Sequence, residues 1–272
     1  MAATLPDLET VTLRRGASNG AELRIELNRP ERMNAWDKQL GLDLLAAVEL
    51  AAEDGGVRAV TITGAGRAFS SGADLRAGFD PRPDNGRPDV GTALRERYHP
   101  IITGVRRMPK PVLAAVNGPA VGIGCSLALA CDLVLATESA YLLLAFVNIG
   151  LVPDGGSSVF VPARAGAGRA ASMALLGERV PAAQASAWGL VDVLVSDDSF
   201  AAEVDALAER LATGPTRSYA AAKTQLNARM YAGLDEQLEL EASLQEEMAG
   251  SADFAEGVQA FLEKRPPRFA GE

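Results

Sequence analysis

The chain has 272 residues, 48% of them hydrophobic, and a formal net charge of −9. This length allows one large domain, or a domain with a smaller appendage, and the negative charge argues against a nucleic-acid partner. No uncharged apolar run reaches the ~18 residues of a membrane-spanning helix, and residues 1–9 lack a signal-peptide pattern. We therefore expect a cytoplasmic protein with no membrane partner.

The first part of the chain alternates between strand and helix patterns. Asp37 is the expected N-cap of one helix, which ends before Gly55 and Gly56. A turn at 17–20 joins the first two strands, and residues 78–92 are expected to form a mobile surface segment. The predicted strands are 11–15, 22–27, 57–63, 112–116, 133–137, 141–146 and 191–195. The later helices of this part are predicted at 92–107, 126–131, 167–176 and 182–188.

Beyond Ser199 the pattern is helical throughout. The predicted helices are 199–212, 216–230, 235–248 and 251–263. A boundary near residue 198 therefore divides an α/β core, residues 1–198, from a helical region, residues 199–272.

The segment from Val116 to Ser126 joins a predicted buried strand to a predicted buried helix through a glycine-rich turn. Such a turn directs free backbone N–H groups at a ligand. The same donors stabilise a carbonyl oxygen that gains negative charge. The alternative is that Gly122 and Gly124 only allow close packing of strand and helix.

The cysteines and the histidine give no sign of their own catalytic site. Cys125 and Cys131 are expected to be buried free thiols, because their spacing fits neither a disulfide framework nor a metal site. We expect no bound metal. His99 is the only histidine, so any histidine-based mechanism depends on it, and its polar surroundings favour a surface position.

Four stretches, in order and spacing, resemble the crotonase superfamily, also called the enoyl-CoA hydratase/isomerase family. They are NRPERMNA (28–35), FSSGADL (69–75), NGPAVGIGC (117–125) and GLVPDGG (150–156). The stretches AWGLVD (187–192) and AFLEKR (260–265) resemble two further features of the family. The resemblance extends over roughly residues 11–269.

The resemblance implies a spiral of ββα units followed by a helical region used for trimerisation, hence a homotrimer or a dimer of trimers. It implies an acyl-CoA thioester substrate, whose coenzyme A is part of the substrate and not a separate cofactor, and a place in fatty acid metabolism. It also implies an oxyanion hole, which maps to the backbone N–H groups of Ser71 and Ile123. The family usually has glycine at the second position, so Ile123 fits only if its φ stays negative.

Further residues are expected to hold the coenzyme A, as the resemblance implies. Arg32 is favoured over Arg29 for a phosphate contact, with solvation of the surface as the alternative for both. Asp74 is also expected to brace its own loop, and Phe261 and Lys264 to reach the coenzyme A of a neighbouring subunit. The full set is Arg32, Ala35, Ser70, Gly72, Ala73, Asp74, Leu75, Gly124, Phe261 and Lys264.

The two glutamates that activate water in hydratases of this family map to Ser126 and Phe146, which cannot move a proton as carboxylates do. Asp154 instead matches the catalytic acid of a branch that includes Δ3,Δ2-enoyl-CoA isomerases and ring-1,2-epoxyphenylacetyl-CoA isomerase. The resemblance thus implies an isomerase with Asp154 as its base. The alternative for Asp154 alone is a turn residue after Pro153.

A base of this kind should lie in an apolar wall that raises its pKa, and the candidates are Phe146, Leu151, Val152 and Phe160. Two other functions stay open: an enoyl-CoA hydratase that lacks the usual glutamates, and a catalytically inert acyl-CoA-binding protein.

Overall fold

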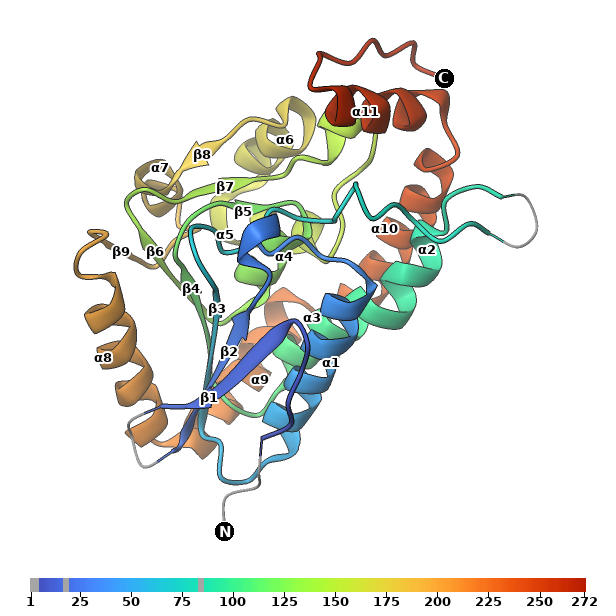
Figure 1. The fold of residues 1–272 in the computed structure, drawn as a ribbon. Coiled ribbons are helices and arrows are strands. Elements are labelled where there is room, and N and C mark those ends of the chain that lie inside the picture. Colours follow the sequence, from blue (N-terminus) through green and yellow to red (C-terminus); the bar gives the residue numbers. More distant parts are fainter. Residues whose placement is uncertain (1–4, 17–19, 83–85) are drawn as a thin grey trace.

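The computed structural model describes residues 5–16, 20–82 and 86–272. Residues 17–19 of the predicted turn and residues 83–85 of the predicted mobile segment lie outside the described residues. The described part is a mixed α/β structure in which a large sheet is covered by helices (Figure 1).

A six-stranded sheet forms the centre of the fold. Its strands, in spatial order, are β1 (Val11–Arg15), β2 (Glu22–Leu27), β3 (Ala59–Gly64), β4 (Val112–Val116), β6 (Leu133–Thr137) and β9 (Val193–Val195). Only the β1–β2 pair is antiparallel; the other neighbours run parallel. All five residues of β4 are buried, as expected for a central parallel strand that is covered on both faces.

A second, three-stranded sheet consists of β5 (Ala120–Val121), β7 (Tyr141–Leu143) and β8 (Val180–Pro181). The strand predicted at 141–146 therefore ends at Leu143, because Phe146–Ile149 forms the 3-10 helix η3. β5 and β8 are too short to produce a periodic pattern, and the sequence did not predict them.

Helices cover both faces of the large sheet. α1 (Lys38–Glu53) packs on β1, β2 and α3 (His99–Arg107), whereas α8 (Phe200–Thr213) packs on β2, β3 and β6 from the other side (Figure 1). The prediction for the start of α1 is confirmed, because the Asp37 side chain accepts the N–H of Leu40 at 2.8 Å.

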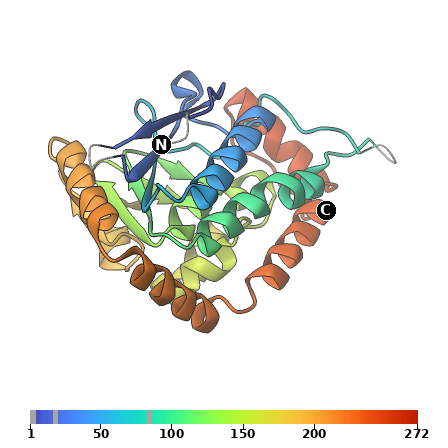
Figure 2. The same cartoon turned by 90° about the horizontal axis from the view of Figure 1, so that it is seen from below.

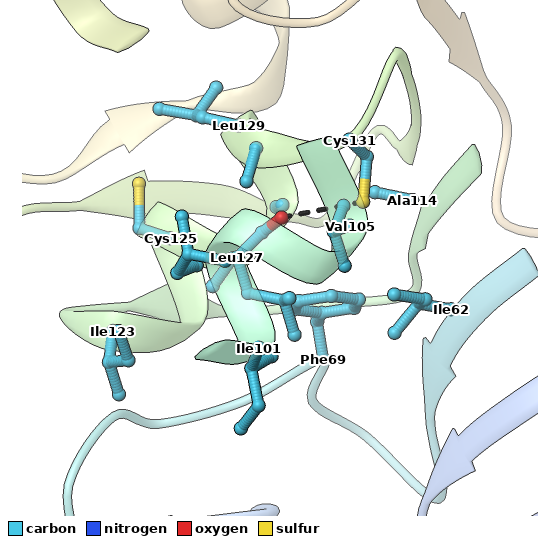
Figure 3. Close-up of a cluster of buried hydrophobic side chains, with 14 of the residues drawn as sticks. Ile62, Phe69, Ile101, Val105, Ala114, Ile123, Cys125, Leu127, Leu129 and Cys131 are labelled. Atoms are coloured by element: carbon cyan, nitrogen blue, oxygen red, sulfur yellow. Dashed lines mark hydrogen bonds between the residues drawn. The ribbon is translucent and has the colours of Figure 1, made fainter. Parts of the chain in front are cut away.

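α4 (Ile123–Ala130) lies inside the molecule, and all its residues are buried. Figure 3 shows its side chains among Phe69 and Ile101 of neighbouring segments. Cys125 and Cys131 are free and buried, as predicted, and burial raises the pKa of both thiols to about 12. They are packing residues of the core.

The helix predicted at 92–107 begins earlier and contains a wider turn. α2 (Val90–Ala93) leads into a π-helical turn, η2 (Leu94–Tyr98), and then into α3. The N–H of His99 donates to the Leu94 carbonyl, which is the i→i+5 bond of a π-helix. Such turns occur frequently at functional sites.

The remaining helices are η1 (Pro30–Arg32), α5 (Ser157–Ala165), α6 (Ala167–Leu176), α7 (Ala182–Ala187), α9 (Thr216–Met230), α10 (Leu234–Met248) and α11 (Ala252–Glu263). Figure 2 shows the C-terminal helices, in orange and red, bordering the rest of the molecule. α10 packs on α2, η2 and α5, and α11 packs on η3, so both helices reach loops of the α/β core. No helix in the described part of the chain is long and apolar enough to span a bilayer.

Candidate active site

A cavity of about 1230 Å³ opens between the loops that follow the strands of the core and the helices α10 and α11. Its wall combines loop residues of the N-terminal half with Gln245 of α10 and with Gly257, Ala260 and Phe261 of α11. The helical C-terminal region is therefore part of the site. Asp154 and Ile123, which the sequence singled out, both line this cavity.

Backbone pairing brings the two glycine-containing loops together. The N–H of Ser70 donates to the Pro119 carbonyl at 3.0 Å, and the N–H of Val121 donates to the Ser70 carbonyl at 2.9 Å. Gly72 has a φ of +90°, and a Cβ at this position would lie 3.0 Å from the Val121 carbonyl oxygen. Glycine is required there because any side chain would separate the loops.

The first predicted oxyanion donor is wrong. The N–H of Ser71 donates to the Met33 carbonyl at 2.9 Å, so it is not free to bind a ligand. The N–H of Ala73 is the free donor of this loop. The backbone N–H of Trp36 donates to the Gly72 carbonyl, and the Trp36 carbonyl accepts the N–H of Asp74. In this parallel bridge the N–H of Ala73, between these two bonds, points away from Trp36. Among the described residues, none accepts a hydrogen bond from it.

The second donor is the N–H of Ile123, at the start of α4. Gly122, with φ +54°, takes the strained position, whereas Ile123 itself is not among the residues with positive φ. Isoleucine is therefore tolerated here, as the sequence analysis required. The helix begins at Ile123 and not at Ser126, so the Ile123 N–H is one of the first-turn donors without a partner inside the helix.

Asp154 lies deep in the cavity wall, where its residue is 5% exposed. Its Oδ1 has no hydrogen-bond partner in the described structure, and its Oδ2 accepts from the Gln245 side-chain amide at 3.2 Å. Burial, and next the negative charge of Glu241, raise the pKa of Asp154 well above 3.8. Phe146 and Leu151 line the cavity as predicted, but Val152 and Phe160 do not.

Two serines fix the backbone that carries this carboxyl group. The hydroxyl of Ser126 donates to the Asp154 carbonyl oxygen at 2.7 Å, and the hydroxyl of Ser157 donates to the same oxygen at 2.8 Å. Ser126 occupies the position of a family glutamate. Its hydroxyl here supports the Asp154 backbone, since it is buried and does not line the cavity.

Two residues of α10 that the sequence analysis missed complete the surroundings of the base. Gln245 also donates to the carbonyl of Val152, and Glu241, one turn earlier, accepts the N–H groups of Gly156 at 2.8 Å and Ser158 at 3.2 Å. Burial raises the pKa of Glu241. No sequence pattern indicates either residue, because polar side chains in a glutamate-rich helix are typical of a solvated face.

Most of the predicted coenzyme A contacts line the cavity: Arg32, Ala35, Gly72, Ala73, Asp74, Leu75 and Phe261. Ser70 and Gly124 do not, so the prediction that they touch the ligand is wrong. Ser70 is fully buried, and a Cβ at Gly124 would lie 2.6 Å from the Ser70 Cβ, so the pair packs beneath the wall. Lys264 is exposed and lies outside the wall of its own chain's cavity; its contact with a neighbouring subunit stays a prediction.

Arg29 and Arg32, the two arginines considered for a phosphate contact, differ in their ion pairs. The Arg29 guanidinium pairs with Asp37 at 2.9 Å and with Asp74 at 3.2 Å, so it ties the two loops together and leaves Asp74 as a brace. The Asp74 carboxylate also accepts the N–H of Arg76 at 3.1 Å. Arg32 is exposed at the cavity wall, together with Arg67, in a chain that is acidic overall. This local positive charge suits an anionic ligand.

His99 does not line the cavity. It is half-buried and not a surface residue, and burial lowers its pKa to about 4. Within the described residues, no cluster of histidine, cysteine or acidic side chains could hold a metal ion. Among the described residues that line the cavity, Asp154 carries the one buried carboxyl group, and it shares the cavity with free backbone N–H donors and an apolar wall. That combination can stabilise the enolate of a carbonyl compound and carry its proton.

Known proteins match this chain over most of its length. Residues 18–272 match the family model for enoyl-CoA hydratase/isomerase. The chain is 45% identical over 260 residues to a "Probable enoyl-CoA hydratase" of Rhodobacter capsulatus, covering 96% of this chain and 98% of that protein. It is 39% identical over 250 residues to the 1,2-epoxyphenylacetyl-CoA isomerase of Escherichia coli, covering 92% and 95%.

A crystal structure of an enoyl-CoA hydratase from Mycobacterium avium subsp. paratuberculosis superimposes with a TM-score of 0.87. It shares 39% identity, over 97% of this chain and all of that one. The fold is thus that of the crotonase superfamily. The chain belongs to the enoyl-CoA hydratase/isomerase family.

Proposed function

We propose that the protein is an acyl-CoA isomerase that shifts a carbon–carbon double bond with Asp154 as its base. The observation that carries this proposal is the one buried carboxyl group among the described residues that line the cavity. Asp154 is buried there with a free Oδ1, while Ser126 and Phe146 replace the two glutamates expected of a hydratase.

The chemistry needs one base and one oxyanion hole. Asp154 Oδ1 takes a proton from C2 of a 3-enoyl thioester, and the C–H electrons form a dienolate whose oxygen accepts from the N–H groups of Ala73 and Ile123. Asp154 then delivers a proton to C4, and the double bond ends between C2 and C3. The raised pKa of Asp154 brings the carboxyl group closer to the pKa that a general base needs near neutral pH.

The names of the relatives support both branches, since one is called a hydratase and another an isomerase. The residues favour the isomerase. The Ser126 hydroxyl is already used by the Asp154 carbonyl, and Phe146 presents an apolar ring, so neither side chain can activate water.

Asp154→Asn tests the assignment. We expect loss of isomerisation of a 3-enoyl-CoA by at least about a thousandfold, within the range that general acid–base catalysis supplies, while the thioester still binds. Activity is followed by the absorbance of the conjugated product and binding by calorimetry. Asp205→Asn, at an exposed aspartate of α8, is the matched control and should keep wild-type activity.

Deuterium uptake from solvent separates the three candidate functions. An isomerase exchanges protons of a 3-enoyl-CoA, a hydratase consumes crotonyl-CoA with loss of its conjugated absorbance, and an inert binding protein does neither. Near-full isomerase activity of Asp154→Asn would show that the base is misassigned.

A further inference from the structure

The hydroxyl of Tyr98 has no role in the scheme above. Tyr98 is the last residue of the π-helical turn η2, and it lines the cavity with Asp154. Its ring packs edge-on against Trp36, with centroids 5.0 Å apart and an interplanar angle of 80°. Trp36 is itself 2% exposed, so a buried partner fixes the position of the tyrosine ring.

This hydroxyl is a donor without an acceptor. No residue in the described part of the chain accepts a hydrogen bond from it. Burial, and next the charge of Asp154, raise the pKa of Tyr98, so the hydroxyl stays protonated. The hydroxyl is not enclosed by protein, so it can pair with water when no ligand is bound. A ligand that displaces this water and supplies an acceptor keeps the donor paired, whereas a ligand without an acceptor leaves it unpaired.

The surroundings restrict what that acceptor can be. Val90 and Leu94 of the same helical segment line the cavity with apolar side chains. The thioester oxygen is assigned to the N–H groups of Ala73 and Ile123, so it is not available to Tyr98. The charge of Asp154 acts on Tyr98, so Tyr98 lies near the proposed base, where the acyl carbons bind under the proposed function. The acceptor expected there is a second oxygen, on the acyl part of the ligand.

We propose that Tyr98 determines specificity by donating a hydrogen bond to an oxygen atom on the acyl group. The substrate class is then acyl-CoA thioesters with an ether, hydroxyl or carbonyl oxygen beyond the thioester. This inference rests on the proposed function, because that function places an acyl-CoA in the cavity.

The test compares matched pairs of saturated acyl-CoA thioesters. One member carries a methoxy group on C4, C5 or C6, and the other carries an ethyl group at the same carbon. Neither member has a double bond to shift, and oxygen at these carbons is not a leaving group for α-proton removal. Calorimetry gives the dissociation constants for the wild-type protein, Tyr98→Phe, Tyr141→Phe and Tyr219→Phe.

We expect the wild-type protein to bind at least one methoxy thioester about tenfold more tightly than its ethyl partner. Tyr98→Phe keeps the ring on Trp36 and should remove this preference. Tyr219, which lies outside the cavity, is the control and should keep the preference. Tyr141 also lines the cavity, with the exposed Arg179 over its ring at 4.6 Å, and its variant should keep the preference too.

Equal affinities within every pair, or a preference that survives in Tyr98→Phe, would overturn the inference. Loss of the preference in Tyr141→Phe alone would assign it to the other tyrosine and overturn it equally. If the wild-type protein shows no preference but still isomerises 3-enoyl-CoA, only the role of Tyr98 fails. If it binds no thioester at all, the proposed function fails as well.

Discussion

Asp154 combines a buried position with incomplete hydrogen bonding, which is unusual for a carboxyl group. One oxygen accepts from Gln245, while the other, Oδ1, is buried without a partner. Under the proposed function, Oδ1 is the atom that takes the substrate proton. This arrangement has consequences for both activity and stability, because the same burial that tunes the base also disfavours its charged form.

The activity should depend on pH through Asp154. The base is active only when deprotonated, and its pKa is raised well above 3.8 by burial and by Glu241. We therefore expect kcat/KM for isomerisation to fall as the pH is lowered through this raised pKa, with the acid limb above the range of an ordinary aspartate. A profile of kcat/KM against pH checks this, and a limb near 4 would contradict it.

The stability should depend on pH in the opposite sense. Below the ordinary aspartate pKa, the group is protonated in both the folded and the unfolded chain. As the pH rises through the raised pKa, the folded protein must hold a buried carboxylate that the unfolded chain leaves in water, so stability is lost. Asp154→Asn should raise Tm by a few degrees at pH 8 and much less at pH 4. An equal or lower Tm at pH 8 would contradict the expectation.

At the scale of elements, α10 connects the base to the C-terminal region. Its inner face holds Gln245 against Asp154 and Glu241 against the start of α5, while Leu240 and Leu244 are exposed on another face. The two inner residues act on Asp154 with opposite sign. A hydrogen bond from Gln245 favours the carboxylate, whereas the negative charge of Glu241 disfavours it.

Variants of α10 should therefore move the acid limb in opposite directions. Gln245→Leu removes the donor and should shift the limb to higher pH, whereas Glu241→Gln removes the charge and should shift it to lower pH. Glu247→Gln, on the exposed side of the helix, is the control. The pH profile of kcat/KM for each variant gives the shift, and displacements of the same sign would show that α10 does not tune the base.

The elements that the sequence predicted well are those with a local cause. β4 is a continuous apolar run, and α1 has both a cap and a periodic apolar face. β5 and β8 are two-residue strands that form by pairing with β7, so no local sequence pattern predicts them. α4 begins before its predicted start because Gly122 takes the positive φ that ends the turn.

The site was predicted in part for the same reason. Asp154 and Ile123 belong to recognisable motifs, whereas the choice between Ser71 and Ala73 depends on the Met33 carbonyl, far away in the sequence. Gln245 and Tyr98 come from helices whose contact with the cavity is set by the tertiary fold. The spacing of residues along the sequence does not predict such contacts.

At the scale of the whole molecule, the C-terminal helices expose large apolar side chains. Leu226 on α9 is 55% exposed and Met230, one turn later, is 43% exposed; Phe261 on α11 is 53% exposed. Exposed apolar surface of this kind is typical of contacts between subunits. It is consistent with the trimer or dimer of trimers that the resemblance implies, which stays a prediction.

A charged α9 should disrupt that assembly. We expect the wild-type protein to have the mass of three or six chains in light scattering, and the double variant Leu226→Glu, Met230→Glu to have a lower mass. Burying two carboxylates in an apolar contact is strongly unfavourable. Thr224→Glu adds a charge on another side of α9 as a control. A wild-type protein with the mass of one chain would contradict the prediction.

The contribution of α10 and α11 to the cavity also has a consequence for biosynthesis. Chains emerge from the ribosome N-terminus first, and the α/β core can begin to fold before its end is made. The cavity wall includes Gln245, Gly257, Phe261 and Arg265, which are all translated after the α/β core. A nascent chain that has not yet reached α11 therefore lacks part of the cavity wall, and under the proposed function it cannot yet act on a thioester.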